Sequence, residues 1–159
     1  MNKLKGSNLQ KAFTLIELLI VISIIGILVA AATVSWRNAQ MKGRDGKRKA
    51  DLKAVQQALE TFLQTNGVYP SGSAKIKCTN SSPDIEWGST FSCNSNTFMQ
   101  TLPKDPVNVS PNVYTYILDP VNPFKYKLYA FLENTKDPDL NPTLCGLPPG
   151  QLVFCVTNP

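Results

Sequence analysis

The sequence predicts an α+β protein in which a long N-terminal helix packs on a small antiparallel β-sheet head. Three observations predict this fold: an apolar run over residues 13–34, an apolar stripe of helical spacing after it, and short β-like segments in the C-terminal half. The 159 residues suffice for one compact domain plus an extended element. We expect four segments: a leader (1–12), a transmembrane half of the helix (13–34), an amphipathic half (35–66) and a globular β-rich head (67–159).

The apolar run reads FTLIELLIVISIIGILVAAATV, with Glu17 as its only charge. As a helix it spans roughly 30 Å, the thickness of a bilayer's hydrocarbon core. Three interpretations are open: a secretory signal cut after Ala30-Ala31-Ala32, a plain signal anchor, or a signal cut before the run so that the helix is kept. The run exceeds the usual 7–15 residues of a secretory signal, and a carboxylate inside it costs roughly 2–3 kcal/mol at mid-depth. Both features favour a retained helix.

The segment KAFTLIELLIVISIIGILVAAA at 11–32 resembles the type IV prepilin signature: a basic leader, a small residue, Phe, then an apolar helix with Glu at its fifth position. The resemblance implies cleavage by a prepilin peptidase between Ala12 and Phe13, and N-methylation of Phe13. The family's usual residue before the cut is Gly, and here it is Ala12. The resemblance further implies a subunit of a helical filament built by inner-membrane assembly machinery.

Glu17 needs a partner, because a buried charge is tolerated only when it is paired. After cleavage Phe13 carries a free amine one helical turn away. In the family the corresponding Glu pairs with the amine of the next subunit and sets the stagger of assembly. The alternative is that Glu17 extends towards the lipid headgroups.

The amphipathic half carries its apolar residues at spacings of three and four: Leu52, Val55, Leu59, Phe62 and Leu63. The opposite face carries Lys53, Gln56, Gln57 and Glu60. Asn66-Gly67 and Pro70 predict the end of the helix. Gly43 and Gly46 each weaken it by about 1 kcal/mol relative to Ala, which predicts a bend or fray there.

Seven basic residues follow the apolar run within seventeen positions: Arg37, Lys42, Arg44, Lys47, Arg48, Lys49 and Lys53. Two interpretations are open, contact with solvent and anionic lipid before assembly, and salt bridges between subunits. With only three lysines before the run, the positive-inside rule places the C-terminus in the cytoplasm. The cysteines and the signature point the other way, so we expect a single-pass protein of the cytoplasmic membrane with its head outside, and an extracellular pilus after assembly.

The head is predicted to contain strands at 113–118, 126–132 and 152–157, the second with Tyr126, Leu128, Ala130 and Leu132 on one face. Its four cysteines, Cys78, Cys93, Cys145 and Cys155, allow three pairings. We favour Cys78–Cys93 and Cys145–Cys155, because each closes a short loop. Zinc is disfavoured, since the chain has no histidine and no CxxC pair.

The stretch LPKDP at 102–106, followed by YTY at 114–116, is similar to major subunits of type II secretion pseudopili. Such pseudopilins often bind calcium through a C-terminal loop. The segment 137–142 offers Asp137 and Asp139 as oxygen ligands, but it lacks the glycine-rich pattern of that loop. We expect no cofactor, with these two residues as weak calcium candidates.

Composition disfavours catalysis and nucleic-acid binding. Without histidine no Ser-His or Cys-His pair exists, and no glycine-rich phosphate loop follows a strand. Although the formal charge is +5, residues 67–159 hold six Lys and seven Asp or Glu, so the head is about neutral. We expect a structural subunit of a type IV pilus-like filament, with a type II secretion pseudopilin or a minor pilin with a binding role as the alternatives.

Overall fold

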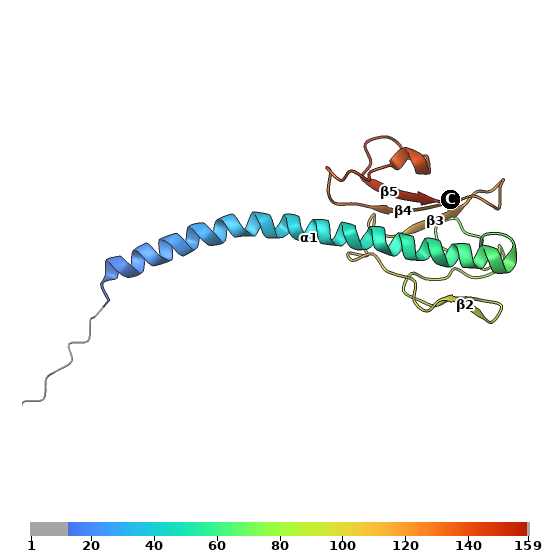
Figure 1. Ribbon diagram of the computed structural model, residues 1–159, viewed down its shortest axis with the longest axis horizontal. Coiled ribbons are helices and arrows are strands. Elements are labelled where there is room, and N and C mark those ends of the chain that lie inside the picture. The colour runs from blue at the N-terminus through green and yellow to red at the C-terminus, as the bar shows by residue number, and fades with distance from the viewer. Residues whose placement is uncertain (1–12, 159) are drawn as a thin grey trace, which may run out of the picture. The chain divides into compact units, whose positions relative to one another are not determined.

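The structure is a computed structural model that describes residues 13–158. The leader at 1–12, including Ala12, lies outside the described residues. In chain order the elements are α1 (Leu15–Asn66), β1 (Phe91–Cys93), β2 (Asn96–Met99), β3 (Thr115–Leu118), β4 (Tyr126–Phe131), the 3₁₀ helix η1 (Pro142–Cys145) and β5 (Val153–Thr157) (Figure 1). This order confirms the predicted α+β class. The chain divides into two compact units, one ending at Ala39 and one beginning at Gln40, which are described separately.

The first unit contributes the apolar part of α1. The mean hydropathy of its most apolar 18-residue stretch is 2.8, and no residue of that stretch is buried. By length and composition α1 is the one helix among the described residues that suffices to cross a membrane.

The second unit contains the amphipathic part of α1. Leu52, Val55 and Leu59 are fully buried and Phe62 nearly so, which confirms the predicted stripe. Gly67 ends the helix with a left-handed φ of 77°, and its amide donates to the Leu63 carbonyl at 2.7 Å. The predicted fray at Gly43 and Gly46 was wrong: helix continues through both glycines. Asp45 and Arg48 lie on this stretch of α1 and are buried against the head, and their contacts stabilise the helix there.

The head is built on an antiparallel sheet with the order β3-β4-β5. Tyr116 pairs with Leu128, and Leu128 in turn pairs with Val156. Along β4 the side chains of Tyr126, Leu128 and Ala130 are buried, while those between them are half-buried. The three predicted strands are confirmed, each shortened by one or two residues.

A second, two-stranded sheet joins β1 and β2 through a tight turn at Asn94 and Ser95, which both have positive φ. The sequence analysis missed this hairpin, because strands of three and four residues carry too little alternation to be recognised. In Figure 1 the hairpin and the three-stranded sheet lie on opposite sides of the C-terminal half of α1. One apolar core connects α1 to both, as the Phe62 ring lies 5.7 Å from that of Phe91 between centroids.

Candidate assembly helix and the charged contacts of the head

The first part of α1 presents an apolar surface that the subunit itself leaves uncovered. The large apolar side chains described between residues 13 and 29, and that of Trp36, are about half exposed or more, from Val21 at 49% to Leu15 at 89%. A helix that is apolar all round is stable only among lipids or other helices. This surface therefore requires a partner that the single chain does not supply.

Glu17 is held at the start of this helix by Thr14. One carboxylate oxygen, Oε2, accepts hydrogen bonds from the Thr14 amide at 2.8 Å and from the Thr14 hydroxyl at 2.7 Å. In return the Glu17 amide donates to Thr14 Oγ1 at 3.3 Å. Because Thr14 directly precedes the first helical residue, this reciprocal pair is a capping box. Its Thr-x-x-Glu pattern is legible in the sequence, although the sequence analysis singled out only Glu17.

The second unit contains a charged cluster that fastens α1 to two loops of the head. The guanidinium of Arg48 is fully buried and bonds Asp105, Nε to Oδ2 at 2.6 Å and Nη2 to Oδ1 at 3.0 Å. Arg48 also donates to Asp45 at 2.7 Å and to Glu133 at 2.8 Å. The Asp105 carboxylate further accepts from the amide of Val107. A buried arginine is stable only with this degree of compensation.

Glu133 and Asp45 form the second half of this cluster. Asp45 accepts hydrogen bonds from the amides of Glu133 and Asn134, the latter at 2.8 Å. Arg44 Nε donates to Glu133 Oε1 at 2.8 Å, and a second guanidinium nitrogen contacts the other oxygen. The hydrogen bond from Arg44 is the main reason that the pKa of Glu133 falls to about 2. Glu133 therefore stays ionised over the whole physiological range.

Lys49 makes a separate contact with the loop that follows β4. Its ammonium nitrogen bonds Asp137 Oδ1 and lies 2.7 Å from Asp139 Oδ2. It also lies 5.8 Å from the centroid of the Phe154 ring, within cation–π range. The two calcium candidates of the sequence analysis are thus brought together, but around a lysine of the same chain.

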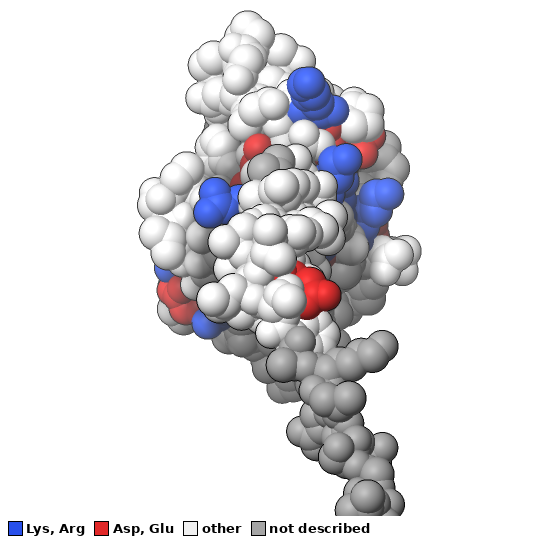
Figure 2. Space-filling model, turned by 90° about the vertical axis from the view of Figure 1, so that its left-hand side faces the viewer, with Lys and Arg blue, Asp and Glu red and all other residues white. Residues whose placement is uncertain are grey.

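These contacts change the interpretation of the basic cluster. Arg44, Arg48 and Lys49 bond carboxylates within the subunit, a role that neither sequence interpretation included. The other four basic residues of the cluster stay exposed: Arg37, Lys42, Lys47 and Lys53. Apart from Asp45, which lies three positions before Arg48, the acidic partners lie 57 to 90 positions away, so no local pattern in the sequence separates the two groups. Figure 2 shows the Lys and Arg side chains of the face it presents as separate groups rather than one continuous field.

The structure contains the disulfides Cys78–Cys93 and Cys145–Cys155, the two short-loop pairings favoured above. The first attaches the segment after α1 to β1. The second attaches η1 to β5, the last strand. No free cysteine occurs.

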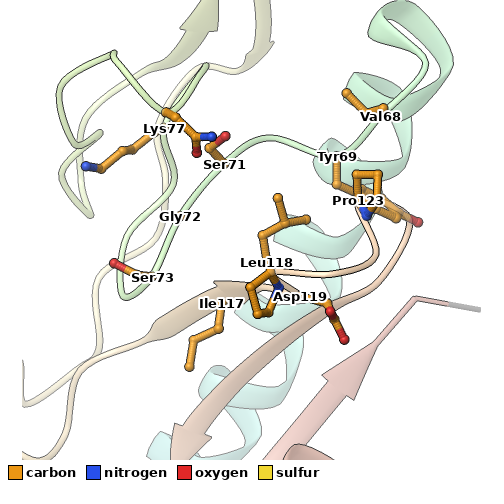
Figure 3. A pocket seen from close by; sticks show the side chains of 12 residues that line it. Val68, Tyr69, Ser71, Gly72, Ser73, Lys77, Ile117, Leu118, Asp119 and Pro123 are labelled. Carbon is orange, nitrogen blue, oxygen red and sulfur yellow. The ribbon is translucent and has the colours of Figure 1, made fainter.

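A hollow of about 610 Å³ lies between the segment after α1 and the end of β3. Figure 3 shows it lined by Ser71, Gly72 and Ser73 on one side and by Ile117 and Leu118 on the other. Its charged side chains are already engaged: Lys77 lies 3.3 Å from Asp84, and Asp119 accepts from the amide of Val121 at 2.9 Å. The lining contains no pair of groups placed for acid–base chemistry.

An exposed apolar helix with a carboxylate in its first turn, continued into a small disulfide-bonded α+β head, defines the pilin class of proteins. Residues 7–33 match the prokaryotic N-terminal methylation motif, and residues 36–137 match the family model of type II secretion system (T2SS), protein G. The second match covers more than half of the chain, which therefore belongs to the T2SS protein G family.

Individual relatives agree with this assignment. The chain is 25% identical to the type II secretion system core protein G of Escherichia coli over 137 residues, covering 86% of this chain and 89% of that protein. It is 29% identical to the protein of the same name from Pseudomonas aeruginosa, covering 80% and 87%. It is 39% identical to the type IV major pilin protein PilA of Myxococcus xanthus over 60 residues, covering 38% and 27%. No solved structure matches the chain significantly.

Proposed function

We propose that this chain is a structural, non-enzymatic subunit of a pilus-like filament in which copies of the apolar helix pack side by side. The observation that carries the proposal is the exposure of every apolar side chain described between residues 13 and 33, combined with a single carboxylate at Glu17. In the filament, packing against neighbouring helices takes the place of lipid and keeps the apolar side chains away from water. The carboxylate of Glu17 fixes how neighbouring helices are aligned along the filament, because a buried carboxylate is stable only next to a cation.

A prepilin peptidase cuts between Ala12 and Phe13 and leaves the helix intact, and Phe13 is then N-methylated. Before assembly the helix spans the cytoplasmic membrane among lipids, with the head on the outer side, where its disulfides are maintained. The inner-membrane assembly machinery then extracts the subunit into the filament. We expect no nucleic acid to bind the head, because residues 67–159 contain six Lys and seven Asp or Glu and so carry no excess of positive charge.

A secretion pseudopilus is the second candidate for the filament. It is favoured by the core protein G relatives from Escherichia coli and Pseudomonas aeruginosa, which are covered over 89% and 87% of their length, whereas the PilA match covers 27% of that pilin. Both candidates share the helix-packing mechanism. They differ in where the filament ends, at the cell surface or within the envelope.

N-terminal sequencing of the protein purified from cell membranes tests the proposal. The expected first residue is Phe13, carrying a methyl group on its amine. A chain that begins at Thr33 has lost the helix, and the filament proposal fails. Immunogold electron microscopy of sheared surface fibres then separates the two candidates, since labelled long fibres mean a pilus and a label confined to the envelope means a pseudopilus.

A further inference from the structure

The loop between β4 and β5 carries two carboxylates, Asp137 and Asp139, that contact the same ammonium group. Its ends are fixed by other contacts. At one end the amides of Glu133 and Asn134 donate to Asp45, and at the other end the side chain of Asn141 exchanges two hydrogen bonds with the backbone of Cys155. The middle of the loop, with Asp137 and Asp139, is held to α1 by Lys49.

The resemblance to secretion pseudopilins implied calcium at this loop, and the donor set does not fit calcium. That ion takes six to eight oxygen ligands. Among residues 13–158 no group of three or more acidic, His or Cys side chains is placed to hold a metal. The two carboxylates that are available both face the Lys49 ammonium, which a divalent ion would first have to displace.

Lys49 is well placed to act as a permanent cation. Its side chain is 19% exposed, and the Phe154 ring closes one side of the ammonium group. Burial lowers the pKa of Lys49, but the hydrogen bonds to Asp137 and Asp139 outweigh that effect and leave the pKa above its ordinary value. The two carboxylates therefore favour the charged form of the group.

We propose that Lys49 is the resident cation of the 133–141 loop and stands where a bound divalent metal would otherwise neutralise Asp137 and Asp139. The head of this protein consequently folds without calcium. Removing the ammonium leaves Asp137 and Asp139 without their partner and destabilises the loop. Calcium does not replace the ammonium, because two carboxylates are fewer oxygen ligands than that ion takes.

Thermal unfolding of the full chain in detergent, followed by circular dichroism in EDTA and in millimolar calcium, tests this inference. For the native chain we expect the same midpoint in both solutions. For Lys49→Met we expect a midpoint lower by roughly 4–8 °C in EDTA, and an equal loss in calcium, because the two remaining carboxylates are too few ligands for that ion. Lys47→Met is the matched control, because Lys47 is an exposed neighbour without a carboxylate partner among the described residues.

A third variant, Lys49→Met with Asp137→Asn and Asp139→Asn, removes the repulsion together with the cation. We expect it to be more stable in EDTA than Lys49→Met and indifferent to calcium. A native chain that loses stability in EDTA overturns the inference. So does a Lys49→Met variant that is as stable as Lys47→Met, or one whose lost stability is restored by calcium.

Discussion

Arg48 and Asp105 are joined by two hydrogen bonds, 2.6 and 3.0 Å long, and both side chains are completely buried. Arg48 lies on α1, and Asp105 lies fifty-seven positions later, in the segment between β2 and β3. The pair fixes the helix to a loop with no regular secondary structure of its own. Among the described residues it is the ion pair in which both side chains are most completely buried, so loss of either partner would leave a buried charge uncompensated.

Replacing Arg48 by Met should destabilise the head by about 3–5 kcal/mol, because Asp45 and Asp105 then remain buried without their cation. Urea unfolding of the full chain in detergent measures this loss. The double variant Arg48→Met with Asp105→Leu should recover part of the lost stability, because position 105 then carries no buried carboxylate without a cation. A loss below about 1 kcal/mol for Arg48→Met alone contradicts the assigned role.

The lowered pKa of Glu133 predicts that the head loses stability in acid. Its folded-state pKa is about 2, against an ordinary value of 4.5, so the unfolded chain binds a proton more readily. The stability contributed by ionised Glu133 is therefore complete above pH 4.5 and is lost as the pH falls towards 2. Glu133→Gln should be less stable at neutral pH and should show a smaller decrease between pH 5 and pH 3. Equal pH slopes for the variant and the native head count against this assignment.

The capping box at the start of α1 separates two roles of Glu17. Glu17→Gln keeps an acceptor for Thr14 but removes the charge, and Thr14→Val removes the cap but keeps the charge. We expect both variants to insert into the membrane. Only Glu17→Gln should fail to form filaments, because a neutral amide cannot pair with the amine of the next subunit. Electron microscopy of sheared fibres provides the measurement, and normal filaments from Glu17→Gln refute the pairing role.

The two disulfides should contribute similar amounts to stability. They close loops of 15 and 10 residues, worth about 3 and slightly less than 3 kcal/mol in the chain-entropy model. Replacing Cys78 and Cys93 together by Ser should lower the free energy of unfolding by about 2–3 kcal/mol, and so should replacing Cys145 and Cys155. Denaturant unfolding of each double variant measures the effect. An unchanged midpoint in either variant contradicts the contribution assigned to that bond.

The sequence by itself determined the elements whose signal is local. The membrane-spanning part of α1 was predicted from a bilayer-length apolar run with one carboxylate. The amphipathic part was predicted from the three- and four-residue spacing between Leu52 and Phe62, and β4 from the alternation along residues 126–132. The end of α1 at Gly67 could also be predicted, because the left-handed backbone conformation that follows a helix end favours glycine. The family was also legible, since a charge at a fixed place in an apolar segment is costly and therefore rare.

Only the tertiary structure decided which charges serve the subunit itself. Arg44, Arg48 and Lys49 look the same in the sequence as Lys42 and Lys47, yet three of these five are bound to acids from distant loops and two face solvent. The physical reason is that Coulombic pairing depends on distance in space, and the acids concerned approach α1 only after the sheet has packed on it. The hairpin of β1 and β2 was decided in the same way, since its short strands are defined by the pairing between them and by the core beneath them.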